Sequence, residues 1–324
     1  LDAGANAERA VPSLLRGFSA PVRLFDDLSA EELGILASFD SDSFNRFEAC
    51  QRLAHNILVA ELSDTTDSDS EDALINALRL ILADNSQRDD FKALCFSVPG
   101  QADTEQRATP ADPPKIFAKR LALQARLGAA LASEIKSIIS ATCHLERASG
   151  RSLQNKLLGL ACASGDETSL DIALAQSENL NMSLSMGGLQ ALNHTDHDNR
   201  GRALDSFYKR WNGAALVMEK WLTLSASSAV YGNIANIKSL MRDPVFDASN
   251  PNKLRSVLGV FAAANPVHFH NSNGSGYRFI AEELVSLDKR NPQIAARMGL
   301  ALTRFSNYGP ERQKQMRDAV SFVA

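Results

Sequence analysis

The chain has 324 residues, of which 44% are hydrophobic and 22% charged, so it has enough apolar material for one large or two smaller buried cores. Its formal net charge is −4, its isoelectric point is about 5.9 and no basic tract stands out, which disfavours nucleic acid or an anionic membrane as a partner. No apolar run approaches the roughly 20 residues that a membrane span needs, so no span is predicted.

Residues 1–28 are interpreted as an entry segment, and residues 29–324 as a helical domain. The chain starts at Leu1 without a signal-peptide pattern, as expected of a piece of a longer protein. Two prolines limit helix formation in this segment, and residues 22–25 have the character of a short extended piece. The first helix is predicted to begin at Ser29, because Glu32 completes a capping box.

Helix start signals continue along the chain. Asp42 or Ser41 can cap the next helix. The acidic stretch 63–72 is interpreted as a solvated connector that caps the following helix, since a calcium loop would need a glycine and a closing glutamate that are missing. The helix after it has an apolar stripe formed by Leu74, Ala77, Leu78, Ile81 and Leu82.

The stretch 97–114 is rich in proline and is interpreted as a long loop with room for one short helical turn, and as the place for a subdomain boundary. Asp112-Pro113 then opens a long helix whose buried face is expected to include Leu127, Leu131, Ile135 and Ile138. Ser149-Gly150 and Ser164-Gly165 are expected to punctuate the helices that follow.

The whole pattern predicts an all-α fold of roughly sixteen helices. Short amphipathic helices joined by tight breaks indicate stacked antiparallel pairs, as in an α-solenoid. No fixed-period repeat is visible, which argues against a regular tetratricopeptide or ankyrin array.

The stretch 249–280 has the highest density of backbone-specifying residues. Asn250-Pro251 and, further on, Asn291-Pro292 each predict a helix start. Arg255 and Arg297 fall in the first turns of these helices, and Gln293 shares a face with Arg297. An arginine near a helix N-terminus can form a binding site for a carboxylate. The alternative is that both arginines lie on the surface and pair with nearby acidic residues.

A structural motif is expected within the same stretch. Gly274 and Gly276 permit a positive-φ turn into the helix at Tyr277, and Asn265, Phe269 and His270 are expected to pin this loop through hydrogen bonds and packing. Residues 273–277 could also be interpreted as a phosphate-binding loop, but the preceding strand and the lysine of such loops are missing. The histidine pairs His268/His270 and His194/His197 lack further ligands at recognisable spacing, so no metal site is predicted.

The stretch 249–280, with 217–221 and 290–297, resembles the C-terminal helical domain of the bacterial-type aminopeptidase N family, which are His-Glu-x-x-His zinc peptidases of the gluzincin type. Residues 14–22 resemble the segment where that domain begins, and residues 44–49 resemble its first long helix. The similarity spans the chain but is strong only at its two ends. It implies that residues 29–324 form a C-terminal domain with an irregular right-handed superhelix, and that residues 1–28 lead in from a preceding domain.

The resemblance also implies a function. The chain has no His-Glu-x-x-His, the nearest fragment being His144-Leu145-Glu146, and no Gly-Ala-Met-Glu-Asn; no catalytic residue is therefore predicted, and the chain alone is expected to be inactive. In the family, the zinc lies in the catalytic domain of the same polypeptide, and the helical domain closes over the active-site chamber and gates peptide access.

The site residues follow from the same resemblance. The residue matching Gln293 lines the pocket for the first substrate side chain, and those matching Arg255 and Arg297 meet the peptide backbone or its C-terminal carboxylate. Lys253 stands where the family has arginine, on a face expected to be exposed. A cytoplasmic location is expected, with which four widely spaced cysteines are compatible. The alternative is a free-standing helical-repeat adaptor that binds other proteins.

Overall fold

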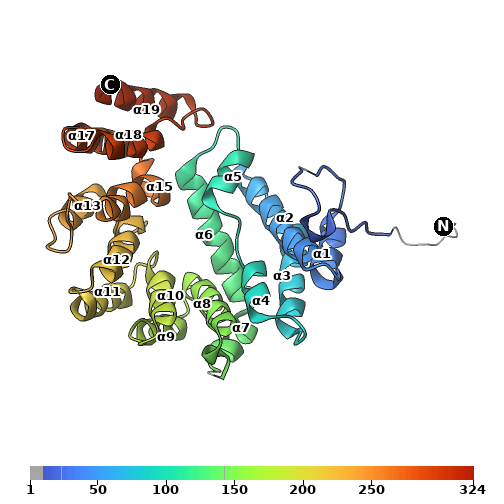
Figure 1. The fold of residues 1–324 in the computed structure, drawn as a ribbon. Helices are drawn as coiled ribbons and strands as arrows, with labels where there is room; N and C mark the ends of the chain where they lie inside the picture. The colour runs from blue at the N-terminus through green and yellow to red at the C-terminus, as the bar shows by residue number, and fades with distance from the viewer. Residues whose placement is uncertain (1–9, 23, 142) are drawn as a thin grey trace. The chain divides into compact units, whose positions relative to one another are not determined.

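The computed structural model describes residues 10–22, 24–141 and 143–324, and it confirms the predicted all-α, solenoid-like class (Figure 1). Over these residues the β structure is one isolated bridge between Ala111 and Tyr308. The extended piece expected at 22–25 includes Arg23, which lies outside the described residues, and its described neighbours form no strand. The interpretation of Leu1 also falls outside them.

The chain divides into two compact units, each made of two separate stretches. Unit 1 comprises Leu1–Pro99 and Ala130–Leu157, and unit 2 comprises Gly100–Ala129 and Leu158–Ala324. The first change of unit falls at Pro99–Gly100, inside the stretch 97–114 that the sequence marks as a break. The chain then returns to unit 1 before it completes unit 2.

Unit 1 is built on amphipathic helices whose starts follow local capping signals. Ser29 and Glu32 form the predicted capping box, and Asp42 caps the second helix. Asp67, in the acidic stretch, caps the third helix, whose predicted apolar stripe is buried. The elements of this unit are η1 Arg16–Phe18, α1 Ala30–Phe39, α2 Ser43–Leu62, α3 Ser68–Ala83, α4 Asp89–Cys95, α7 Ala132–Ile139, η2 Cys143–Glu146 and the first part of α8 Ala148–Ala163.

Several local expectations are wrong between residues 97 and 165. The expected loop contains a two-turn helix, α5 Gln101–Arg107, in which the hydroxyl of Thr104 donates to the carbonyl of Gly100. The expected long helix is two helices, α6 Pro113–Ala130 and α7, because the backbone leaves helical geometry at Leu131 (φ −113°, ψ 20°). Beyond this break Ile135 is buried as expected, but the second buried residue is Ile139, while Ile138 is half-buried.

The two Ser-Gly pairs behave differently. Ser149-Gly150 lies in the first turn of α8 and interrupts nothing, because a glycine in a first turn keeps helical geometry at modest cost. Ser164-Gly165 follows the end of α8, where Gly165 adopts φ 80° and turns the chain toward the next helix.

Unit 2 holds the remaining helices, which pack mainly against their sequence neighbours; α9 lies against α10, and α17 against both α18 and α19 (Figure 1). Over the described residues the α labels exceed the expected sixteen, because α14 and α16 are single turns and because α5 and the break between α6 and α7 were not expected. Besides α5 and α6, the elements are α9 Glu167–Ser177, α10 Met182–Leu192, α11 Asp198–Trp211, α12 Ala215–Ser227, α13 Ile234–Leu240, α14 Pro251–Leu254, η3 Arg255–Gly259, α15 Val260–Ala264, α16 Pro266–Phe269, α17 Ser275–Asp288, α18 Pro292–Gly299, η4 Leu300–Leu302 and α19 Pro310–Val323.

The segment 251–264 is one continuous helix with a π turn in its middle. Residues at both junctions, Arg255 and Val260, keep right-handed helical φ and ψ, while the hydrogen-bond pattern widens over Arg255–Gly259. Single π turns of this kind are frequent at functional sites. None of the described helices is both long and apolar enough to cross a bilayer.

Candidate functional site

Three Asn-Pro steps start the short helices around the candidate site. The side-chain oxygens of Asn250, Asn265 and Asn291 accept hydrogen bonds from backbone N–H groups in the first turns of α14, α16 and α18. In each case proline occupies the first helical position, where its missing N–H costs nothing. The predicted helix starts at Asn250 and Asn291 are therefore present.

These helices surround a cavity of about 700 Å³ that lies entirely within unit 2. Arg255, Gln293 and Arg297, singled out from the sequence, all line it. Arg255 is the first residue of the π turn, which ends at Gly259. The other lining residues are Gln101, Ala102, Glu105, Pro251, Leu258, Gly259, Ala262, Ala263, Pro266, Phe269, His270, Ile280, Asn291, Ile294, Met298, Leu300, Ala301, Arg304 and Tyr308.

The acidic member of the lining comes from α5. The carboxylate of Glu105 accepts hydrogen bonds from the Tyr308 hydroxyl at 3.2 Å and from Nε2 of Gln101 at 2.8 Å. Burial, with the neighbouring Glu105 charge, raises the pKa of Tyr308, so that its hydroxyl remains a donor at neutral pH. The carboxylate is thus already held by two protein donors.

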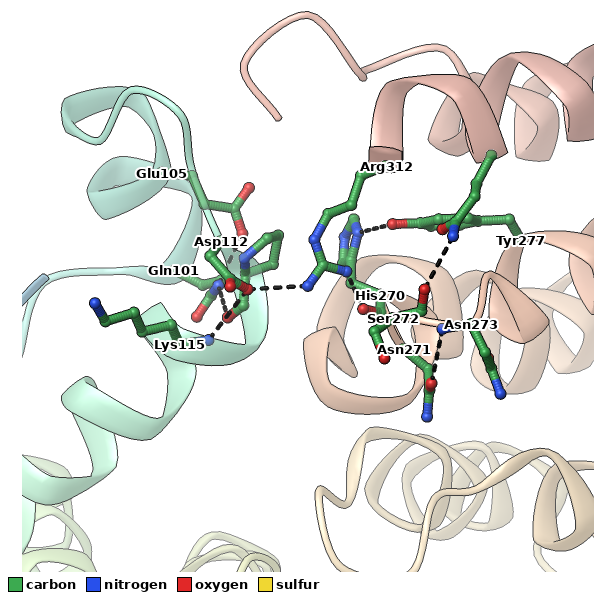
Figure 2. Close-up of polar contacts among 12 residues, drawn as sticks. Gln101, Glu105, Asp112, Lys115, His270, Asn271, Ser272, Asn273, Tyr277 and Arg312 are labelled. Atoms are coloured by element: carbon green, nitrogen blue, oxygen red, sulfur yellow. Dashed lines mark hydrogen bonds and ion pairs between the residues drawn. The ribbon is translucent and has the colours of Figure 1, made fainter. Parts of the chain in front are cut away.

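The predicted structural motif forms a wall of this cavity, because Phe269 and His270 both line it. Figure 2 shows the polar contacts of His270 with Tyr277 and of Arg312 with Asp112. Nδ1 of His270 lies 2.7 Å from the Tyr277 hydroxyl, and the ring of Phe269 contacts both of these side chains edge-on. Burial, followed by the Arg312 charge, lowers the pKa of His270 to about 3, so the imidazole is neutral at physiological pH. Arg312 donates to the His270 carbonyl and, at 3.0 Å, to Asp112 at the start of α6.

The two glycines of the motif are required for different reasons. Gly274 adopts φ 70° at the start of α17, the left-handed conformation expected from the sequence. Gly276 allows close backbone approach, because a Cβ there would lie 2.3 Å from the carbonyl oxygen of Phe269.

Asn265 connects α16 to the end of α12. It is buried, and its Nδ2 lies 2.9, 3.1 and 2.9 Å from the carbonyl oxygens of Ala226, Ser228 and Gly232. The last carbonyls of a helix have no partner within the helix, and Asn265 supplies one. Gly232 is needed for this approach, since a Cβ there would lie 2.3 Å from Nδ2.

The histidine pairs make structural contacts. Nε2 of His268 lies 2.9 Å from the Ala229 carbonyl, and Nδ1 of His194 accepts from the Ala229 N–H at 3.3 Å. In the described ranges no three His, Cys, Asp or Glu side chains gather closely enough to hold a metal ion. Lys253 is half-buried rather than exposed, because its ammonium group donates to the Val245 carbonyl.

Sequence reasoning missed the lining residues Glu105, Arg304 and Tyr308. No local signal could reveal them, since Tyr308 and Glu105 are 203 residues apart and meet only in the folded unit. Arg304 follows η4 and lies in a stretch with no cap or motif.

The helix pairs and this cavity define an α-solenoid domain of the armadillo-repeat class. The chain belongs to the family described as "Domain of unknown function (DUF3458_C) ARM repeats", which matches residues 30–324. It is similar to aminopeptidase N of Caulobacter vibrioides (32% identity) and of Escherichia coli (31%), in each case over 96% of this chain and 37% of the relative. These matches confirm the predicted resemblance to the C-terminal domain of aminopeptidase N.

A solved structure has the same fold. A crystal structure of Legionella pneumophila aminopeptidase A in complex with aspartic acid superposes with a TM-score of 0.86 at 26% identity, covering 98% of this chain and 39% of that one. The chain therefore spans less than two fifths of the length of the proteins that it resembles.

Proposed function

We propose that this chain is the non-catalytic C-terminal domain of a zinc aminopeptidase, a hydrolase that removes N-terminal residues from peptides. The domain closes over the active-site chamber, gates the access of peptides and completes the substrate pocket. Its principal partner is the catalytic domain of the same polypeptide. The observation that supports this proposal is the convergence of Arg255, Gln293 and Arg297 on one cavity of peptide-binding size.

Each of the three residues has a role in this proposal. Gln293 lines the pocket for the first substrate side chain with an amide that can both donate and accept. Arg255 and Arg297 receive the peptide backbone or the C-terminal carboxylate, which the planar guanidinium fork matches. His270, Tyr277 and Asn265 hold the cavity wall in place.

The zinc of the proposed enzyme is assigned to the catalytic domain. The sequence has no His-Glu-x-x-His, and the described histidines that lie near each other bond to the backbone instead. The residues present here therefore do not fit a catalytic zinc site. A cytoplasmic location belongs to the same proposal and is supported by Cys50, Cys95 and Cys162, which are buried free thiols.

The test compares substrates in the longer polypeptide that carries this chain. Replacing Arg255 or Arg297 by alanine is expected to raise KM about tenfold for tripeptides without acidic side chains, because one charge-assisted hydrogen bond is lost. KM for single-residue chromogenic amides should hardly change, because these lack the carboxylate. Arg278→Ala, an exposed arginine of α17 that does not line the cavity, is the matched control. Equal effects on both substrate types would contradict the proposed role.

The alternative is a free-standing adaptor, favoured by the armadillo-repeat description, since repeat domains of this class present extended binding surfaces. A His-Glu-x-x-His sequence upstream in the same reading frame decides for the peptidase. A reading frame that starts with its own Met at this domain decides for the adaptor.

A further inference from the structure

The cavity contains a surplus of positive charge. Three of its lining residues are arginines: Arg255, Arg297 and Arg304. Across the described residues, none of these three guanidinium groups makes an ion pair or a side-chain hydrogen bond, and all three side chains are exposed. Arg312, immediately behind the wall, shows the contrast, since it has both Asp112 and a carbonyl as acceptors.

The acid that lines the cavity does not neutralise these arginines. Glu105 is the acidic residue of the lining, and its two oxygens accept from Gln101 and Tyr308. Three cations against one anion leave the described lining with a formal charge of +2. The C-terminal carboxylate of an ordinary peptide would offset only half of it.

The arginines also come from different parts of the unit. Arg255 and Arg297 project from the π turn and from α18, both elements started by an Asn-Pro step. Arg304 comes from the segment between η4 and α19. Its positive charge interacts with the hydroxyl of Tyr308, which donates to Glu105. A ligand that uses Arg304 as well as the other two must therefore carry its negative charge at two places.

We propose that the cavity selects short peptides that carry two carboxylates, the C-terminal one and an acidic side chain beside it, with Arg304 receiving the acidic side chain. This inference rests on the proposed function, in which the same cavity takes peptides. Arg304 is then a specificity-determining residue. Glu105 weakens the preference for an acidic side chain, because its negative charge lines the same cavity.

The experiment measures binding of two matched tripeptides, Ala-Ala-Glu and Ala-Ala-Gln, to the 324-residue chain by ligand-detected NMR at low salt. They differ only in the side-chain carboxylate. The glutamate peptide is expected to have a Kd about three- to tenfold lower, the size of one added charge contact in a partly solvated cavity. The difference should shrink as salt is added, because salt screens exposed charges.

Three variants test whether Arg304, rather than the overall charge of the chain, causes the difference in Kd between the two peptides. Arg304→Met should bring the Kd ratio of the two peptides to about 1, while leaving the Kd of the glutamine peptide within about twofold. Glu105→Gln keeps an acceptor for Tyr308 but removes the charge, so it should enlarge the ratio. Arg278→Met removes the same charge outside the cavity and should leave the ratio unchanged.

Equal binding of the two peptides, binding of neither, or an Arg304→Met ratio equal to that of the unaltered chain would overturn the inference. Its failure is distinguishable from failure of the proposed function. The KM comparison on the longer polypeptide uses tripeptides without acidic side chains and does not involve Arg304.

Discussion

Asn265 offers a sharp test of how the wall behind the cavity is built, because it is one of three Asn-Pro helix starts with different surroundings. Asn265→Ala removes the N-cap bond to His268 and the amide that reaches the end of α12. Asn291→Ala removes only an N-cap bond, to Ile294. The two variants change the same residue type in the same local motif.

The expected cost follows from the carbonyls involved. Ser228 retains the Gly232 N–H as a donor, while the carbonyls of Ala226 and Gly232 lose the one described donor that reaches them. A lost cap costs about 1 kcal/mol, and each buried carbonyl left unpaired costs about 1–3 kcal/mol. Asn265→Ala should therefore lower the free energy of unfolding by about 3–7 kcal/mol, and Asn291→Ala by about 1 kcal/mol.

Urea denaturation followed by tryptophan fluorescence is the assay. The chain has two tryptophans, Trp211 and Trp221, and both lie in unit 2, the second of them in α12 itself. The signal therefore reports the unit that Asn265 stabilises. The midpoint should fall with an unchanged m-value if unit 2 unfolds cooperatively.

Replacing the two asparagines by aspartate gives the result that would refute this reasoning. Asp is as good an N-cap as Asn, so Asn291→Asp should be nearly neutral. At Asn265 the same change sets a carboxylate oxygen against three carbonyl oxygens, so Asn265→Asp should be at least as destabilising as Asn265→Ala. Asn265→Asp with the stability of the unaltered chain would show that the amide contacts with α12 contribute nothing.

Two further predictions concern the same wall. Gly276→Ala should destabilise unit 2 by about 3 kcal/mol or more, because the new Cβ would overlap the Phe269 carbonyl. The control is Gly201→Ala on an exposed face of α11, which should stabilise the chain by about 0.5–1 kcal/mol. Equal urea midpoints for the two variants would contradict the close backbone approach at Gly276. The free energy of unfolding should also fall as pH decreases from 6.5 toward 3, since the unfolded chain protonates His270 near 6.5 while the folded chain resists until about 3. His194, whose folded pKa is about 4 because of burial, acts in the same direction, so His270→Gln should reduce the slope without abolishing it, and an unchanged slope would remove His270 as a contributor.

Helix starts in this chain were predictable because their signals are local. Ser29 with Glu32, Asp42, and the Asn-Pro steps at Asn250 and Asn291 each place a side-chain oxygen within reach of backbone N–H groups two or three residues ahead. That geometry does not depend on the rest of the fold. The placement of Arg255 and Arg297 followed from the same starts.

Features that depend on distant contacts were not predictable. The break at Leu131 occurs in a sequence with continuous helical character, and α5 is so polar that its sequence resembles a loop. Glu105, Arg304 and Tyr308 reach the cavity only because segments some 200 residues apart pack together. Hydrophobic periodicity carries no information about such contacts.

The division of each unit into two stretches has a consequence for how the chain is assembled. Synthesis from the N-terminus produces α5 and α6 well before α19, which supplies Arg312 for Asp112, and before Tyr308, which pairs with Glu105. Because contacts of such long sequence separation form slowly, Glu105 in α5 must wait for Tyr308, and Asp112 at the start of α6 must wait for Arg312 in the final helix. A ribosome-bound chain halted before Arg304 would have α5 and α6 but would lack Arg304 and Tyr308 of the cavity lining and Arg312 of α19.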